Sequence, residues 1–317
     1  MRWVPFWPRT SATSGELVNT LFIAELCVCA AILALVFGLI WLFCIRYRRG
    51  STAPRGDPGE KSWSVEIAWT VGTLFAFLVL FVWGAKSYVW LYRPPPADLD
   101  IYVVGQQWMW KVEHPGGQRE IDELHLPVGK NVRLVMASQD VIHSFFIPEF
   151  RVKHDVVPGT LEVMWFRPTE TGHFTILCAE FCGTQHAHMG GQVVVLEQPE
   201  YALWLSNQGI SEPLAQQGEA LFRTYGCSGC HGANSTVHAP SLAGLYGRLV
   251  HLADSSTVPA DERYIRDKVL LPNKEIVAGY PTVMPSYAGQ IGEDELMKLI
   301  AYIQSLAPSA TNQGRTR

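Results

Sequence analysis

The chain has seven cysteines, and their spacing points to metal and cofactor chemistry rather than to disulfide bonds. They form three groups along the chain: Cys27, Cys29 and Cys44; Cys178 and Cys182; Cys227 and Cys230. An odd number of cysteines with tight spacing inside the pairs does not fit a disulfide framework. Each of the last two pairs is therefore a candidate ligand set, together with the histidines and methionines beside it.

The mid-chain pair lies in a segment rich in soft and borderline metal ligands. Residues 178–189, CAEFCGTQHAHM, hold two thiols, the imidazole of His186 and the thioether of Met189, and His143 lies upstream in the run DVIH. Such a set favours copper, zinc or iron over Mg²⁺ or Ca²⁺. A Cys2His2 zinc site has the same spacing, but copper electron-transfer sites often carry a weak axial methionine that zinc does not use. His188 is the alternative imidazole ligand.

The second pair belongs to the motif CSGCH at 227–231. C-x-x-C-H is the attachment signature of c-type haem. The thiols of Cys227 and Cys230 would add across the haem vinyl groups, and the ring of His231 would bind the iron. Thioredoxin-like redox chemistry is the competing interpretation, but no βαβ pattern surrounds the motif. A zinc site would need a second cysteine pair, and none follows in the sequence.

An electron-carrying haem needs a sixth ligand, and a thioether in that place raises the reduction potential. Only Met284 and Met297 follow the motif. Met284 lies in the loop GYPTVMP, which two prolines stiffen, whereas Met297 lies on an amphipathic helix predicted over 293–306 and is expected in its packing face. We therefore expect Met284 to be the ligand, with His238 and His251 as the alternatives.

Two apolar runs near the N-terminus are long enough to cross a membrane. Residues 26–45 carry no charge in 20 positions and would reach about 30 Å as a helix, so we predict spans over about 21–45 and 67–91. A signal peptide is the alternative for the first run, but arginines follow it instead of a small-residue cleavage site. The segment 46–61 carries five cations against two acids, which places it in the cytoplasm and the later residues outside.

The rest of the chain divides into a β-rich part and a helical part. Short β-branched runs between Pro and Gly turns predict a β-sandwich or barrel with strands over 101–105, 108–113, 131–137, 161–166 and 192–197. The predicted division is 1–96 for the N-terminal segment and the transmembrane hairpin, 97–198 for the β domain, 199–212 for a linker, 213–307 for a helical domain and 308–317 for a tail.

Composition supports a folded, membrane-bound protein. Hydrophobic residues make up 48% of the 317 residues and charged residues 17%, which is below the roughly 25% of average soluble proteins. Disorder is therefore excluded for the bulk of the chain. The formal net charge of −4 also argues against a nucleic-acid partner, which would require a basic surface.

The C-x3-C-x3-H-x2-M loop, the upstream DVIH and the two apolar helices together resemble subunit II of haem–copper cytochrome c oxidase. The runs GQQWMW at 105–110 and KHDVVPG at 153–159 carry the same resemblance, which covers residues 20–198. The C-terminal part resembles a class I cytochrome c domain, as in the subunits II that carry their own haem c. The segment 69–73 lacks the family's usual proline, and Met109 stands where an aromatic residue is common, but neither departure removes a ligand.

This resemblance implies a membrane-anchored multidomain fold: a two-helix transmembrane hairpin, an all-β cupredoxin domain that holds a binuclear CuA centre, and an all-α class I cytochrome c domain. The implied copper ligands are Cys178 and Cys182 as bridges, His143 and His186 as terminal ligands, and Met189 with the backbone carbonyl of Glu180. Trp108 matches the residue through which electrons enter, the Glu180 side chain a Mg²⁺ contact with subunit I, and Glu66 the mouth of a proton channel.

The implied function is that of subunit II of a proton-pumping cytochrome c oxidase, an oxidoreductase whose oxygen site lies in partner subunit I. Electrons would pass from a soluble cytochrome c or similar donor to haem c, then to CuA, then to subunit I. Subunit III and membrane lipids are further implied partners. The implied location is the inner or plasma membrane of a bacterium, crossed twice, with the C-terminal domains on the periplasmic or extracellular side. A membrane-tethered electron carrier and the copper subunit of a nitric oxide reductase are the alternatives.

Two further expectations concern packing. A flexible linker favours a helical domain that swivels on a small polar interface. Four histidines outside the ligand motifs are expected at the surface or in loops: His114, His125, His154 and His173.

Overall fold

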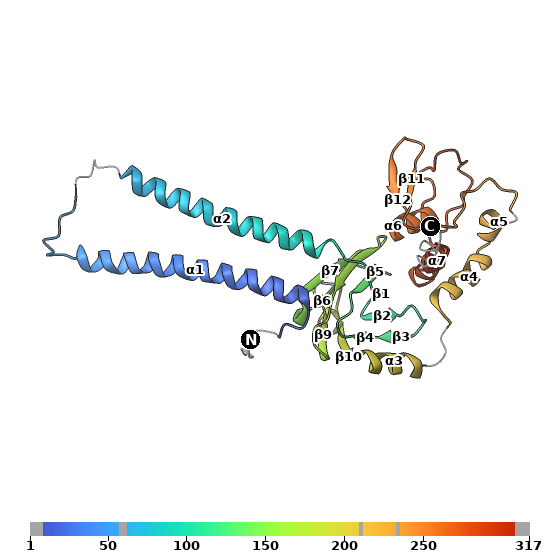
Figure 1. Ribbon diagram of the computed structural model, residues 1–317, viewed down its shortest axis with the longest axis horizontal. Coiled ribbons are helices and arrows are strands. Elements are labelled where there is room, and N and C mark those ends of the chain that lie inside the picture. The colour runs from blue at the N-terminus through green and yellow to red at the C-terminus, as the bar shows by residue number, and fades with distance from the viewer. Residues whose placement is uncertain (1–8, 57–61, 209–211, 233–234, 308–317) are drawn as a thin grey trace, which may run out of the picture. The chain divides into compact units, whose positions relative to one another are not determined.

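The structure is a computed structural model that describes residues 9–56, 62–208, 212–232 and 235–307 (Figure 1). The chain forms two compact units: one is Thr13–Pro94, and the other joins Met1–Ala12 to Pro95–Arg317. The predicted tail over 308–317 lies outside the described residues.

Two long apolar helices make up the first unit, α1 (Thr13–Arg46) and α2 (Trp63–Leu91), and they run side by side in opposite directions (Figure 1). The hydroxyls of Thr70 and Thr73 donate to the carbonyls of Glu66 and Trp69 at 2.8 and 2.7 Å, which satisfies these polar groups within the helix. Both helices are long and apolar enough to cross a membrane. Each begins several residues before the predicted span.

Two five-stranded sheets make up the β-sandwich domain, as the turn-rich pattern predicts. One sheet has the strand order β3-β2-β1-β5-β8 and the other β4-β10-β9-β6-β7. The inner faces share one core, in which Trp110, Leu134, Phe145 and Ile176 are fully buried. The elements are β1 (Leu99–Gln106), β2 (Met109–Glu113), β3 (Arg119–Ile121), β4 (Glu123–Pro127), β5 (Val132–Ser138), β6 (His143–Ile147), η1 (Pro148–Phe150), β7 (Val152–Val156), β8 (Glu162–Phe166), β9 (Gly172–Cys178), η2 (His186–His188) and β10 (Gly190–Leu196).

The five strands predicted from the sequence correspond to β1, β2, β5, β8 and β10, with ends displaced by at most two residues. Three of the other five strands of the sandwich, β3, β6 and β9, escape prediction for two reasons. Strand β3 has only three residues, and β6 and β9 run into the ligand segments, beginning at His143 and ending at Cys178. Ligand runs therefore lie directly on strand ends, where the sheet positions them.

The helical domain packs its N-terminal helix against its C-terminal one. A Cβ added to Gly218 of α4 would lie 2.0 Å from the backbone oxygen of Lys298 in α7, so only glycine permits this approach. The elements are α4 (Leu214–Thr224), α5 (Ser228–His231), β11 (Leu249–His251), β12 (Thr257–Pro259), α6 (Glu262–Leu270) and α7 (Glu293–Ser305), the last being the amphipathic helix predicted over 293–306.

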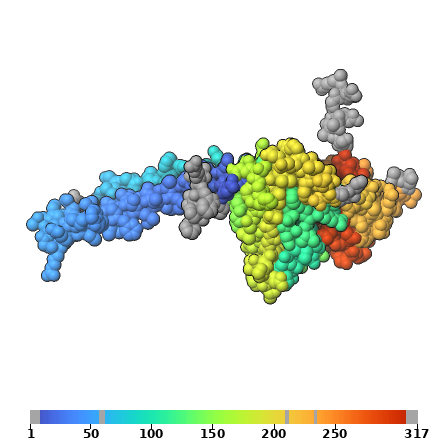
Figure 2. All heavy atoms as spheres, turned by 90° about the horizontal axis from the view of Figure 1, so that it is seen from below, coloured from blue at the N-terminus to red at the C-terminus, as the bar shows by residue number. Residues whose placement is uncertain are grey.

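The helical domain packs on the outer face of the first sheet. In Figure 2 its orange and red atoms lie directly against the green atoms of the β-sandwich domain. In β1, Ile101 and Val103 point into the sandwich core, whereas Tyr102 and Val104 point into a second core that includes Ile300 of α7. The strand is therefore buried on both faces. This packing contradicts the expectation of a helical domain that swivels on a small polar interface.

Buried charges also connect the two domains. Arg133 of β5 reaches Glu262, at the start of α6, at 3.0 Å. Arg266 of α6, only 4% exposed, donates to the carbonyl of Gly159 and pairs with Glu293 at 2.6 Å. Buried charges of this kind are tolerated only when their partners are in place. They therefore fix one orientation of the helical domain on the sandwich.

The segment predicted as a linker over 199–212 begins with a helix instead. Helix α3 (Gln198–Asn207) follows β10 directly, and Glu197 and Glu200 form its capping box. Tyr201 of this helix is buried. Most of the predicted linker is therefore helix, and a connector to α4 begins only after Asn207.

Residues 9–12, ahead of α1, pair with the β-sandwich domain. The amide of Ser11 donates to the carbonyl of Glu149 at 3.1 Å, and the amide of Thr169 donates to the carbonyl of Ser11 at 2.9 Å. Ala12 bridges to Pro168 and is fully buried. The chain thus leaves this unit after Ala12, forms the two long helices and rejoins it afterwards.

We predict that Arg266→Ala destabilises the packed domains by about 3 kcal/mol. The substitution leaves Glu293 without its cation and the Gly159 carbonyl without its donor at a buried interface. The exposed pair of Arg223 and Glu219 provides the control, since Arg223→Ala should cost under about 0.5 kcal/mol. Denaturant unfolding of the purified chain in detergent, followed by near-ultraviolet circular dichroism, measures both. Equal losses in the two variants would contradict the buried-pair interpretation.

Candidate functional site

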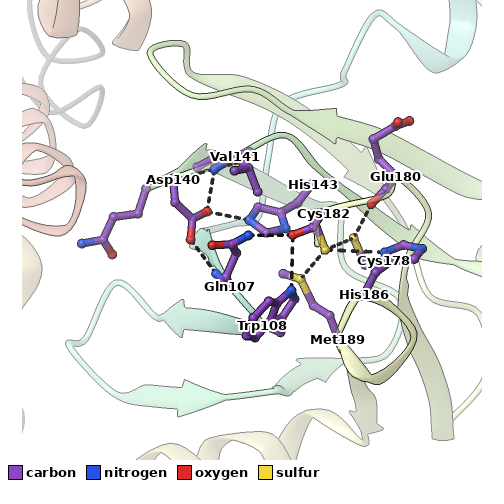
Figure 3. A network of polar contacts seen from close by, with 12 residues as sticks. Gln107, Trp108, Asp140, Val141, His143, Cys178, Glu180, Cys182, His186 and Met189 are labelled. Carbon is purple, nitrogen blue, oxygen red and sulfur yellow. Dashed lines mark hydrogen bonds and ion pairs between the residues drawn. The ribbon is translucent and has the colours of Figure 1, made fainter. Parts of the chain in front are cut away.

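The donors of the segment CAEFCGTQHAHM converge around one loop (Figure 3). Cys178 ends β9, Met189 precedes β10, and the Cys178 amide donates to the Met189 carbonyl at 3.1 Å, which closes the loop. The sulfur of Cys182 lies 3.7 Å from each of the Cys178 and Met189 sulfurs and 3.5 Å from Nδ1 of His186. The carbonyl oxygen of Glu180 lies 3.3 Å from the Cys178 sulfur. Five donors predicted from the sequence therefore form one connected cluster, centred on the sulfurs of Cys178 and Cys182.

His143 adds a second imidazole from the neighbouring strand. It begins β6, which pairs with β9 beside Cys178, and it is fully buried. Its Nδ1 has no hydrogen-bond partner among the described residues, and the donor atoms of His143, Cys178 and Cys182 all lie within 4.8 Å of one another. A buried nitrogen without a partner costs free energy. The arrangement therefore fits a soft or borderline metal ion such as copper, which would accept this lone pair.

Asp140 holds the His143 ring from its other side (Figure 3). Its carboxylate accepts hydrogen bonds from Nε2 of His143 at 2.8 Å and from the amides of Gln107 and Val141 at 2.7 Å each. Burial alone would raise the pKa of Asp140, but these hydrogen bonds lower it below its usual value. A carboxylate on one ring nitrogen sets the tautomer that leaves the other free to bind a metal.

The two loop thiols differ in their affinity for a proton. Burial would raise the pKa of Cys178, but the nearby His143 ring lowers it below its usual value. Burial and the adjacent Cys178 sulfur raise the pKa of Cys182 above its usual value. Of the two thiols, Cys182 therefore holds its proton more tightly. A metal ion bound by both sulfurs would displace that proton.

Trp108 and Gln107 support the loop from the connection between β1 and β2. Nε1 of Trp108 and Nε2 of Gln107 both donate to the Cys182 carbonyl, at 3.2 and 2.8 Å. A Cβ on Gly183 would lie 3.0 Å from Gln107 Nε2, and Gly183 has φ of +119°, so space and backbone both require glycine. Trp108 is half-buried, one hydrogen bond from the backbone of the ligand loop.

Three residues singled out from the sequence lie apart from the donor cluster. The Glu180 side chain is exposed and points away from the sulfurs, although its carbonyl faces them (Figure 3). His188 is exposed, whereas His186 is the imidazole in contact with Cys182. Glu66 lies in the first turn of α2 and belongs to the other unit.

The C-x-x-C-H motif lines a cavity of about 270 Å³ in the helical domain. Cys227, Cys230 and His231 form part of its wall, and Met284 belongs to the same wall. Nδ1 of His231 donates to the carbonyl of Pro240 at 2.9 Å, which leaves Nε2 free for an axial bond. Most of the remaining wall is apolar, so the residues present fit a haem attached through the two thiols.

The alternative axial ligands lie in less suitable places than Met284. Met297 is 2% exposed in the core between α7 and its neighbours, and it is not among the residues of the cavity wall. His238 is on the wall, but its ring is stacked on Tyr280 with centroids 4.8 Å apart. His251 lies in β11, outside the described wall.

Sequence reasoning misses one buried cluster. His114 is fully buried, with Nε2 2.7 Å from Glu120, and the other oxygen of Glu120 lies 2.5 Å from Nδ1 of the half-buried His125. His114 follows the end of β2 and lies in a loop, as expected, but it is not at the surface. The signal was present, because His114 continues the alternation of buried positions that Trp110 and Val112 begin in β2.

Comparison with known proteins finds similarity along most of the chain. The family profile "Cytochrome C oxidase subunit II, periplasmic domain" matches residues 117–197, and the profile "Cytochrome c" matches residues 215–307. "Cytochrome c oxidase subunit 2" of Alkalihalophilus pseudofirmus is 29% identical over 302 residues, which cover 90% of this chain and 85% of that protein. "Alternative cytochrome c oxidase subunit 2" of Bradyrhizobium diazoefficiens is 31% identical over 244 residues, covering 64% of this chain and 84% of that protein.

Among solved structures, the crystal structure of the periplasmic domain of subunit II of cytochrome oxidase from Bradyrhizobium japonicum is 34% identical, with a TM-score of 0.36. It covers 37% of this chain and 96% of that chain.

Proposed function

Since the chain belongs to the cytochrome c oxidase subunit 2 family, we propose that its two soluble domains hold two electron carriers in series on the route to oxygen. The chain is subunit II of a haem–copper cytochrome c oxidase, and its helical domain is a cytochrome c domain. It works with the other oxidase subunits and is anchored in the membrane by apolar helices. One observation carries the proposal: a soft-donor cluster and a C-x-x-C-H cavity occur within one packed unit.

The oxidase family implies copper, and we propose that the copper is a binuclear CuA centre. Six donors would form it, with Cys178 and Cys182 as bridges, His143 and His186 as terminal ligands, and Met189 with the Glu180 carbonyl completing the shell. The 3.7 Å separation of the two cysteine sulfurs and the unpartnered Nδ1 of His143 support this assignment.

The cytochrome c domain implies haem c, for which we propose thioether bonds from Cys227 and Cys230 and axial ligands from His231 and Met284. Their common position on one cavity wall supports this assignment. When bound, the haem and the copper pair supply one-electron carriers with unchanged ligands in both oxidation states.

The protein's own residues keep the copper site dry and rigid. Cys182 and Met189 are 3% and 2% exposed, so water is excluded from the sulfurs. Asp140 holds the His143 ring, and the side chains of Gln107 and Trp108 hold the loop backbone at Cys182. A site whose ligands cannot move reorganises little when its charge changes, which favours fast electron transfer.

The points of contact with partners are also proposals. Trp108 would be the residue through which electrons reach the copper loop, because its indole donates to the Cys182 carbonyl. A soluble cytochrome c or similar donor would dock beside the haem cavity, where Ile276 and Val283 are apolar wall residues 40% and 61% exposed. Subunit III, a Mg²⁺ ion at Glu180 and proton uptake at Glu66 rest on the family resemblance alone.

Both ends of the helical hairpin would lie on one side of the membrane. Residues 9–12 pair with the β-sandwich domain before α1 begins, and the chain returns to that domain after α2. If α1 and α2 both cross the bilayer, the loop between them must lie on the other side. Its excess of positive charge assigns that side to the cytoplasm, and the soluble domains to the periplasm or exterior.

We expect Cys182→Ser to abolish the delocalised mixed-valence electron paramagnetic resonance signal of the copper-loaded chain, because one sulfur bridge is lost. Cys44→Ser, which removes a cysteine of α1 instead, is the matched control and should leave the signal unchanged. An unaltered spectrum in Cys182→Ser, or one zinc and no copper in the wild-type chain, would overturn the binuclear assignment.

Met284→Ala should lower the haem reduction potential and slow oxidation of the external donor, since the iron loses its thioether ligand. Met297→Ala should instead cost about 2–5 kcal/mol of stability, as expected for a buried methionine, with little change in the haem spectrum. Redox titration and absorption spectroscopy of the two variants measure this. The reverse pattern would mean that Met297 is the ligand.

A membrane-impermeant maleimide should label a cysteine placed at the exposed Arg9 in intact spheroplasts, whereas a cysteine at Ser51 should react only after permeabilisation. The expected difference follows from the pairing of residues 9–12 with the β-sandwich domain. Labelling of Ser51→Cys from outside would reverse the proposed orientation.

A further inference from the structure

A second cluster of metal-binding side chains lies outside the proposed copper and haem sites, where the chain passes from β3 to β4. The carboxylates of Glu120 and Glu123 and Nδ1 of His125 all lie within 4.8 Å of one another. Strands β3 and β4 belong to different sheets of the sandwich. A group bound at this point would therefore hold the two sheets together at their junction.

The Glu120 carboxylate is fixed by a buried chain of hydrogen bonds. Its side chain is 6% exposed, and one oxygen lies 2.7 Å from Nε2 of His114, which is 0% exposed. Nδ1 of His114 lies 3.0 Å from the hydroxyl of Tyr201 in α3. The amide of His125 also donates to Glu120, at 3.0 Å. Such outer partners orient a carboxylate for metal binding.

Side chains outside the cluster also hold Glu123 and His125 in place. Nε2 of Gln192 in β10 donates to the Glu123 carboxylate at 2.8 Å. The His125 ring is stacked on Trp204 of α3, with ring centroids 4.3 Å apart and an angle of 10° between the planes. Each candidate ligand thus has an independent partner that fixes its direction.

The Glu120 carboxylate is paired with the His114 and His125 rings, which carry a positive charge only when protonated. Within the part of the chain that the structure describes, neither Glu120 nor Glu123 forms an ion pair with a lysine or arginine. Two carboxylates and an imidazole are ligands that zinc accepts.

We propose that Glu120, Glu123 and His125 bind one divalent ion of the zinc class, separate from the copper and the haem. Nδ1 of His125 and an oxygen of Glu120 are 2.5 Å apart, and the ion replaces the proton between them, which is released to solvent. Through Tyr201 and Trp204 the same cluster holds α3, from which the chain continues to the helical domain.

Zinc binding to the purified oxidase complex, loaded with copper and haem, tests this proposal. Complexes equilibrated with Zn²⁺ and freed of loosely bound metal should retain one more zinc per subunit II in the wild type than in His125→Gln or Glu123→Gln. Zinc bound elsewhere in the complex cancels in this difference. The Gln192→Met variant, which removes only the outer partner of Glu123, should bind zinc about 10-fold to 100-fold more weakly.

Glu113→Gln is the matched control, because Glu113 is on the same hairpin but pairs with Arg119 outside the cluster. It should keep the wild-type zinc content. The copper and haem absorption bands report whether each variant folds. If the His125→Gln complex does not assemble, the zinc content of the Glu123→Gln complex tests the proposal. Equal zinc content and affinity in the wild type, His125→Gln and Glu123→Gln would overturn the proposal and leave the cluster as a set of hydrogen bonds.

Discussion

The organisation of this chain depends on the burial of a single β-sheet on both of its faces. The inner face of β1 and β5 builds the sandwich core, and the outer face, with Tyr102, Val104 and Val135, belongs to the core of the helical domain. Because the two cores share strands, the domains cannot separate without exposing apolar surface and breaking the buried contacts of Glu262 and Arg266. Electron transfer between the proposed carriers then takes place in one fixed geometry, and no diffusive search by a tethered domain precedes it.

Local patterns in the sequence were sufficient to predict most of the donor cluster and of the framework. Cys178, Cys182, His186 and Met189 lie within one loop, so spacing alone brought them together, and the structure places their donor atoms in contact. His143 lies 35 residues before Cys178, so a strand pairing rather than spacing brings it to the loop. The sequence offered it only as an upstream imidazole donor, and its role as a terminal copper ligand came from the family resemblance.

The predictions that failed concern contacts between distant segments. The run IYVV at 101–104 is continuously apolar, as is typical of a strand buried on both faces, yet nothing local says what covers the second face. For His114 the alternation in β2 indicated an inward position, but its partner Tyr201 lies in a helix that was predicted as linker. Residues 199–212 were predicted as a connector, but a capping box and packing against the sandwich stabilise a helix of ten residues, which would be marginal in isolation.

The pairing of Ser11 with Glu149 and Thr169 constrains how the protein is made. These partners are separated by about 140 to 160 residues, so the first described segment to leave the ribosome waits for some of the later strands before it can fold. Contacts of such long range close slowly, because the intervening chain must first be ordered. Under the proposed topology, the buried Ala12 would therefore make translocation of residues 9–12 a precondition for completing the sandwich core. If these residues stayed on the other side of the membrane, that core, which also contains Cys178 and Cys182, would lack one of its segments.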